Sequence, residues 1–214
     1  MGVSPSLAVA AAALGAGAVA CGSSGYQYVE NDDLGVYARL PDDWAVYDEA
    51  DLYPDDSDRE RDRRTSRMWL RTFDAADEPS VEASRSAGDD TPTGIMEVRG
   101  LTPQEREQLD LGALRGGGNP ALDPVAAAAS GAPNVEIISD EPVEFDGGFS
   151  GVHTVFVVDE GGTPVVTERM AVRNATTTAI ALFQVSCSET CYFETHKDDI
   201  ADLVESWTIQ EVRR

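Results

Sequence analysis

The residue with the clearest chemistry in this chain is Cys21, a thiol that directly follows an uncharged apolar run. Residues 7–20 read LAVAAAALGAGAVA, and the small polar stretch GSSG follows Cys21. The run is too short to span a bilayer permanently, which takes about 20 residues. It ends in the small side chains that a signal peptidase requires. We therefore predict that residues 1–20 are a signal peptide and that the rest of the chain is exported.

Two processing outcomes are open at this site. Residues 18–20, AVA, fit the A-x-A rule for ordinary secretory cleavage. A cysteine directly after the cut, followed by GSSG, resembles the lipobox of bacterial lipoproteins, which we favour. In that family the thiol carries diacylglycerol, and burial of its chains contributes about 0.8 kcal/mol per methylene to membrane binding. We expect Cys21 to anchor the chain at the extracytoplasmic face of the cell membrane, with residues 21–32 as a flexible tether and residues 33–214 as one domain.

The other two cysteines, Cys187 and Cys191, lie in the stretch VSCSETCYFETH. Three intervening residues can form a tight turn that brings the two Cα atoms within bonding reach, and export places both thiols in an oxidising compartment. We predict a disulfide. A metal site that adds His196 is the weaker reading, because a structural zinc ion needs a fourth ligand. A redox dithiol is weaker still, because its usual spacing is C-x-x-C.

Neither histidine is placed in a catalytic pattern. The alternating pattern of GVHTVFVV predicts that His153 is packed in a sheet or lies at its edge. His196 falls at the start of the last predicted helix, where we expect it to be exposed. Members of a Ser-His-Asp set need not be adjacent in sequence, but GFSGV lacks the second glycine of G-x-S-x-G. We predict no catalytic, cofactor-binding or metal-binding residue.

Two further motifs are better explained by a structural role than by ligand binding. Residues 48–64 are densely charged, which indicates a solvated helix or loop. A calcium-binding loop fits less well, because an EF-hand counted from Asp56 would have Arg61 and Arg67 where it needs Gly and Glu. Residues 116–118 are three glycines that we interpret as a helix terminator, since neither Lys-Ser nor Lys-Thr follows to form a phosphate-binding loop.

The charge of the chain excludes one class of partner. The 39 Asp and Glu residues outnumber the 16 Lys and Arg residues, which gives a formal net charge of -23. A field of this sign repels a phosphate backbone. We therefore expect no binding to nucleic acid.

The elements that position these residues alternate between strands and short helices. Periodicity and turn residues predict a hairpin from 34–40 and 44–47, with Trp44 in the core, then strands at 65–73 and 94–101. Four strand-like runs from residue 134 onward, separated by spacers such as EGG, predict an antiparallel meander.

Three helices are also predicted. The first starts at Thr102 with a capping box and runs to the glycines at 116–118, with Leu109, Leu111 and Leu114 as packing residues. A second, short helix is predicted to start after Asp123. The last runs over 195–207 with Thr195 as its cap, and its apolar stripe must pack on the sheet before a final edge strand at Ile209 and Val212.

Three motifs together resemble the PsbP-like superfamily, which includes the LpqN-type envelope lipoproteins of actinobacteria. They are LPDDW early in the chain, FDGGFSG in the middle, and a late strand, CY, helix and SWTI. The resemblance covers most of the chain after residue 33. It implies one α+β domain, an α/β/α sandwich with a central antiparallel sheet, and a role in binding or assembly.

We therefore expect a lipid-anchored, non-catalytic binding or scaffolding protein whose partner is an envelope protein or a glycolipid. A surface-tethered hydrolase is one alternative. A carrier of a lipid or glycolipid is the other, and it would need an apolar cavity between sheet and helix. Tight packing of Trp44, Trp69 and Trp207 would speak against such a cavity.

Overall fold

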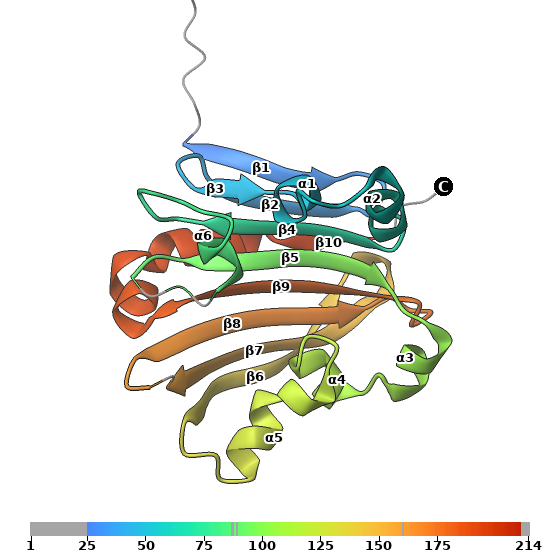
Figure 1. The fold of residues 1–214 in the computed structure, drawn as a ribbon. Helices are drawn as coiled ribbons and strands as arrows, with labels where there is room; N and C mark the ends of the chain where they lie inside the picture. Colours follow the sequence, from blue (N-terminus) through green and yellow to red (C-terminus); the bar gives the residue numbers. More distant parts are fainter. Residues whose placement is uncertain (1–24, 87, 89, 160, 211–214) are drawn as a thin grey trace, which may run out of the picture.

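The computed structural model describes residues 25–86, 88, 90–159 and 161–210, which fold into two antiparallel sheets and several short helices (Figure 1). The larger sheet has seven strands in the order β3-β4-β5-β9-β8-β7-β6, and the smaller has the order β1-β2-β10. The strands are β1 (Tyr26–Asn31), β2 (Val36–Pro41), β3 (Ala45–Tyr47), β4 (Met68–Asp74), β5 (Thr93–Gly100), β6 (Val135–Phe145), β7 (Phe149–Asp159), β8 (Pro164–Arg173), β9 (Ala179–Ser188) and β10 (Thr208–Ile209).

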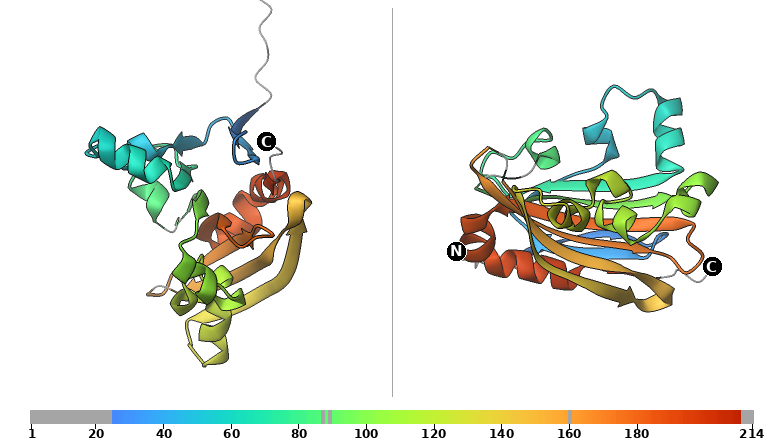
Figure 2. Two further views of the ribbon diagram at one scale, coloured as in Figure 1. Left: turned by 90° about the vertical axis from the view of Figure 1, so that its right-hand side faces the viewer. Right: turned by 90° about the horizontal axis from the view of Figure 1, so that it is seen from below.

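Helices cover both faces of the larger sheet, which makes the fold the predicted α/β/α sandwich. We call the face under the C-terminal helix α6 the inner face, and the face that carries the other helices the outer face (Figure 2). The helices are α1 (Glu49–Leu52), α2 (Asp58–Thr65), α3 (Pro103–Gln108), α4 (Leu111–Arg115), α5 (Pro124–Ala129) and α6 (Lys197–Ser206). The predicted meander is confirmed as β6 to β9, and β9 then pairs with β5.

The main core lies on the inner face, where the apolar stripe of α6 packs as predicted. Ile200, Leu203 and Trp207 are at most 2% exposed. Trp44 and Trp69 belong to the same core and are also buried. The tryptophans thus pack tightly between sheet and helix, which speaks against a carrier cavity at that interface.

The predicted hairpin is wrong, and the domain starts earlier than expected. β2 pairs with β1, whereas β3 pairs with β4 in the other sheet. The turn at 41–43 therefore carries the chain from one sheet to the other. Residues 26–31, predicted as part of the tether, are strand β1 because YQYVEN is rich in β-forming aromatic residues and Tyr28 stacks on Tyr37 across the pair at 5.7 Å.

The helix predicted from Thr102 to the glycines is two helices. The capping box of Thr102 and Glu105 is confirmed at the start of α3. A second cap then interrupts the helix, since the Asp110 side chain accepts a hydrogen bond from the backbone N–H of Ala113 at 2.8 Å and starts α4. This break turns Leu111 outward, where it is 54% exposed, so its predicted packing role is wrong.

The last helix starts later than predicted. Residues Cys191–Thr195 form a separate turn of π-helix, and α6 starts after His196, so Thr195 is not its cap. His196 is half-buried, and its ring forms a T-shaped contact with Trp44 with the ring centres 6.3 Å apart, so its predicted exposure is wrong. β10 forms the predicted last strand at Ile209, whereas Val212 lies outside the described residues.

A disulfide joins Cys187 to Cys191, with a Cα–Cα distance of 5.9 Å. Both cysteines are buried, so the bond ties the turn after β9 to the inner face. We expect the double variant C187A/C191A to lose about 2 kcal/mol of unfolding free energy, as a short closed loop predicts. In a chain of this size the melting temperature should fall by about 4–8 °C.

Thermal unfolding followed by circular dichroism checks this expectation. The wild type melted in reductant is the matched control and should unfold at the temperature of the double variant. Equal melting temperatures of the wild type with and without reductant would contradict a stabilising bond.

None of the helices in the described ranges is long and apolar enough to cross a membrane. The predicted signal peptide and Cys21 lie outside these ranges.

Candidate functional site

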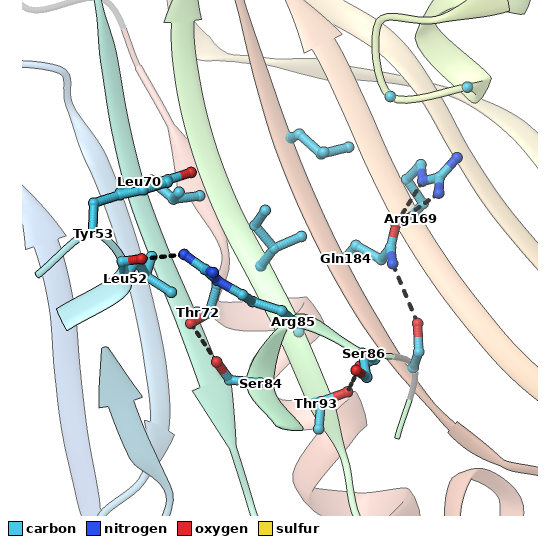
Figure 3. Close-up of a pocket in the computed structure, with 16 residues that line it drawn as sticks. Leu52, Tyr53, Leu70, Thr72, Ser84, Arg85, Ser86, Thr93, Arg169 and Gln184 are labelled. Carbon is cyan, nitrogen blue, oxygen red and sulfur yellow. Dashed lines mark hydrogen bonds between the residues drawn. The ribbon is translucent and has the colours of Figure 1, made fainter. Parts of the chain in front are cut away.

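A pocket of about 550 Å³ lies on the outer face of the larger sheet, between two groups of helices. Its floor consists of side chains from β4, β5, β8 and β9, the strands at the centre of the sheet. One wall is the end of α1 with the 3-10 turn η1 (Ala83–Arg85), and the other is the pair of glycines after α4. We call it the arginine pocket, after Arg85 and Arg169 in its lining (Figure 3).

Local hydrogen bonds hold the first wall in place. α1 is only four residues long, and its start is fixed by a capping box between Asp48 and Asp51. Arg85 of η1 donates a hydrogen bond to the carbonyl oxygen of Leu52 and lies 5.1 Å from the ring centre of Tyr53. The guanidinium of Arg85 therefore fastens η1 to α1 at the rim of the pocket.

The second wall depends on glycine. A Cβ at Gly116 would lie 1.9 Å from the backbone oxygen of Asn119, and Gly117 has a φ of +66°. Both positions require glycine, because the chain turns back on itself immediately after α4. The three glycines do end the helix as predicted, and they also bring the backbone to the edge of the pocket.

The floor of the pocket is polar although it lies in the middle of a sheet. Thr72 and Ser84 are hydrogen-bonded through their hydroxyl groups at 2.8 Å, and the Thr93 hydroxyl donates to the carbonyl oxygen of Ser86 at 2.7 Å. The hydroxyl of Ser186 is within 3.0 Å of that of Thr167. The aliphatic residues of the lining are Leu52, Leu70, Ile95 and Leu182. Such a mixed lining suits an amphiphilic molecule.

Arg169 is the most heavily desolvated charge of the pocket. Its Nε and Nη2 donate to the Oε1 of Gln184 at 2.9 and 2.7 Å, and its Nη1 donates to the backbone oxygen of Arg115 at the end of α4. These acceptors are neutral, and no carboxylate in the described part of the chain pairs with this guanidinium. Burial lowers the pKa of Arg169 to about 10, so it stays charged at neutral pH.

Helix α4 is itself anchored to the sheet by an ion pair. Arg115 donates to both carboxylate oxygens of Asp140, and the Thr154 hydroxyl donates to the same carboxylate at 2.9 Å. Burial works against ionisation of Asp140, but these hydrogen bonds hold its pKa below the usual value. This anchor fixes the carbonyl oxygen that orients Arg169.

The charge of the lining is opposite to that of the protein. The described lining residues include two arginines and neither Asp nor Glu. Glu97 follows Ile95 on the same face of β5, but it is paired with the Nε of Arg99 at 3.1 Å, and burial raises its pKa. The pocket is therefore locally cationic in a chain with a formal net charge of -23.

The residues singled out from the sequence do not meet at this pocket. His153 and the Cys187–Cys191 disulfide lie on the inner face, and His196 lies beyond it at the start of α6. The Nε2 of His153 is 2.6 Å from one oxygen of Glu168, and Tyr192 donates to the other. Burial, together with the charge of Glu168, raises the pKa of the Tyr192 hydroxyl.

This cluster of Glu168, His153 and Tyr192 occupies both carboxylate oxygens with neighbouring side chains. Glu168 is 6% exposed, so the cluster fastens the turn after the disulfide to β8. Within the described ranges, no group of three or more His, Cys, Asp or Glu residues is placed to hold a metal ion.

The sequence interpretation missed both Glu168 and Arg169. They are adjacent in the middle of β8, in the run PVVTERMAVR, and successive residues of a strand point to opposite faces. An acid and a base side by side in the middle of a mostly apolar strand were the available signal. The pocket itself has no local signal, because its lining comes from segments over 100 residues apart.

No protein-family model and no curated protein matches this sequence. Solved structures do match over most of its length. Cyanobacterial PsbP (CyanoP) from Synechocystis sp. PCC 6803 has 15% identity and a TM-score of 0.47, and the match covers 89% of this chain and 95% of that one. LpqN, described as involved in cell envelope biogenesis of Mycobacterium tuberculosis, has 14% identity and a TM-score of 0.45 over 87% and 91% of the two chains.

The Ran-binding protein Mog1p of Saccharomyces cerevisiae is also similar, with 10% identity and a TM-score of 0.44 over 87% of this chain and 96% of its own. A PsbP protein and LpqN, to which the sequence motifs show a resemblance, are among these solved structures. At these identities the likeness concerns the fold alone and carries no conclusion about function.

Proposed function

We propose that this chain is a non-catalytic binding protein of the cell envelope, which takes an amphiphilic small molecule in the arginine pocket. It is exported and held at the membrane by a lipid on Cys21. The observation that carries the ligand part of the proposal is the mixed lining of the pocket. Aliphatic side chains, hydroxyl groups and a desolvated guanidinium lie within one space of about 550 Å³.

A pocket of this size is within the range that small-molecule sites occupy. A sheet face that needed only to be covered would carry apolar residues, as the inner face does. The outer face instead has the polar residues Thr72, Thr93 and Ser186 in the lining of the pocket, each with a hydrogen-bonded hydroxyl group. They are at most 3% exposed, so they fix the shape and polarity of the floor around Arg169.

The non-catalytic part of the proposal rests on the separation of the chemical groups. His153 and Glu168 are on the face opposite the arginine pocket, and both oxygens of Glu168 have partners. The described lining of the pocket contains serine, threonine and arginine but neither histidine nor a carboxylate. Its hydroxyl groups therefore lack the neighbouring general base that nucleophilic catalysis needs.

The anchor part of the proposal rests on the sequence around Cys21. Strand β1 begins at Tyr26, so residues 22–25 alone connect the lipidated cysteine to the domain. Four residues span at most about 14 Å. A lipid on Cys21 would hold the domain close to the membrane, where amphiphilic ligands are concentrated.

Filling the pocket tests the ligand part of the proposal. We expect the variant I95W to bind the neutral apolar dye Nile red at least about ten-fold more weakly than the wild type, because the indole would occupy the apolar part of the lining. The measurement is a fluorescence titration. The matched control is I138W, since Ile138 lies on the edge strand β6, is 47% exposed and is not part of the described lining.

Both variants should keep the circular dichroism spectrum of the wild type. Nile red binding that is equally strong in the wild type and in I95W would place the dye elsewhere and contradict the proposed pocket. An absence of binding to the wild type would contradict it as well.

A further inference from the structure

We infer that the ligand of the arginine pocket is an anionic amphiphile whose carboxylate or phosphate headgroup binds Arg169. This inference rests on the proposed function, because it names the chemical class of the ligand for the same pocket. It depends on three observations: the free donors of Arg169, the absence of acids from the described lining, and the position of the aliphatic residues.

Arg169 has hydrogen-bond donors to spare. Its contacts to Gln184 and to the Arg115 carbonyl use one N–H each on Nε, Nη1 and Nη2. Each terminal nitrogen carries a second N–H, so one donor remains on Nη1 and another on Nη2. A pair of donors on one guanidinium is the arrangement that binds the two oxygens of a carboxylate or phosphate.

The existing contacts also hold the guanidinium in one orientation. Gln184 accepts from two nitrogens of Arg169, and its own Nε2 is 3.4 Å from the hydroxyl of Ser186. The side chain of Arg169 also lies against the ring of Phe156, with its Cζ 5.3 Å from the ring centre. A guanidinium held on both sides loses little side-chain entropy when a ligand binds.

The charge of Arg169 is left without a counter-charge in a chain rich in acids. Burying a cation is costly unless an anion compensates it. The sequence has 39 acidic residues, yet the described lining includes none, and the ion pairs of the outer face involve other arginines. Burial alone accounts for the lowered pKa of Arg169, which agrees with the missing partner. An anionic ligand would supply the compensation.

The net charge of the protein does not prevent an anion from entering. Charges separated by more than about 8 Å are largely screened at physiological ionic strength. Within the described lining the charges are those of Arg169 and Arg85, and Arg85 is exposed at the opposite wall. Beside the lining, the carboxylates of Glu49 and Asp140 are each paired with an arginine, so the two guanidinium groups of the lining leave the local charge positive.

The aliphatic residues determine where the body of the ligand lies. Leu182 is two residues from Gln184 on the same face of β9, and Ile95 of β5 pairs with Gln184. Leu70 of β4 and Leu52 lie further along, at the first wall (Figure 3). A ligand with its headgroup on Arg169 would extend its apolar part over these side chains toward Tyr53. The ligand class is thus an oxyanion with an attached apolar chain.

Matched probes test this assignment. Dodecanoate, dodecyl phosphate and dodecanol share one alkyl chain and differ in the headgroup, and isothermal titration calorimetry below their aggregation concentrations measures their affinities. We expect the wild type to bind at least one of the two anions about ten-fold or more tightly than the alcohol. The stronger anion identifies the headgroup.

Three variants complete the experiment. R169M should lose most of the preference for the anions over the alcohol, because the donors of Arg169 are removed while most of the side-chain volume remains and only the charge of Arg85 stays in the lining. R169K keeps the charge and should retain part of the preference. R173Q is the matched control on the same strand, since Arg173 is exposed at its end, and it should behave as the wild type.

The wild type alone can overturn the inference, even where R169M does not fold. If it binds dodecanol as tightly as both anions, the pocket binds amphiphiles but the anionic class is wrong, and the proposed function stands. If it binds none of the three probes, the proposed function falls together with the inference. An unchanged preference in folded R169M would also overturn the role of Arg169.

Discussion

Replacing Trp207 with alanine should lower the free energy of unfolding by about 3–5 kcal/mol, the usual cost of truncating a buried tryptophan. Trp207 is 2% exposed and follows the last residue of α6. Its ring forms a T-shaped contact with Phe145 of β6, with the ring centres 5.2 Å apart, and its centre lies 5.8 Å from that of Phe183 in β9. Trp207 therefore links the first and last strands of the meander to the helix. Chemical denaturation followed by circular dichroism measures the loss.

The variant W207F is the matched control. The indole Nε1 of Trp207 is buried and has no hydrogen-bond partner among the described residues, so phenylalanine removes ring volume without breaking a hydrogen bond. We expect W207F to cost about 1–2 kcal/mol. A cost in W207A no larger than that of W207F would show that the contacts of α6 with the sheet do not depend on this ring.

Replacing Cys21 with serine should move the protein from the membrane fraction to the soluble fraction almost completely. A diacylglycerol contributes two acyl chains, and stable anchoring requires about two such attachments. Without the thiol neither chain can be attached. Fractionation of cells that express the wild type and C21S, followed by immunoblotting, measures the shift.

The double variant C187A/C191A is the control here, because it removes the other two thiols and should stay with the membrane. Intact mass supplies the complementary measurement. The wild type should carry a diacylglycerol on Cys21 and lack two hydrogen atoms at the disulfide. An unmodified Cys21 in a soluble wild-type protein would indicate ordinary secretory cleavage and contradict the anchor.

The elements that sequence patterns predicted well are those whose signal is local. The meander from β6 to β9 follows from alternation and short spacers, two of which contain glycine, and α6 follows from its apolar stripe. The capping box at Thr102 fixes the start of α3 in the same way. In each case a few adjacent residues supply both the pattern and its physical cause.

The errors occurred where distant residues compete with local signals. The turn at 41–43 favours a hairpin, but β3 gains its partner from β4, about 30 residues further along the chain. The side chain of Asp110 accepts one hydrogen bond that starts α4 and so separates it from α3. The periodicity of apolar residues does not reveal such a contact. Alternation also leaves the pairing partner of each strand open, so the extra sheet of β1, β2 and β10 was not predicted.

The candidate site was harder to predict than the fold. Arg169 reaches the pocket because β8 pairs with β9 in one register, and the walls come from α1 and from the glycines after α4. These segments are brought together by tertiary packing alone. The sequence directed attention to histidines and cysteines instead, because those residue types are typical of known chemistry.

The adjacent Glu168 and Arg169 also discriminate against misfolding. A shift of β8 by one residue relative to β7 and β9 would exchange the two faces of the strand. The carboxylate would then point into the cavity beside Gln184, and the guanidinium would enter the apolar layer under α6 next to Tyr192. Both faces of β8 would be destabilised at once, so this pair of opposite charges makes slipped alignments of the strand unfavourable.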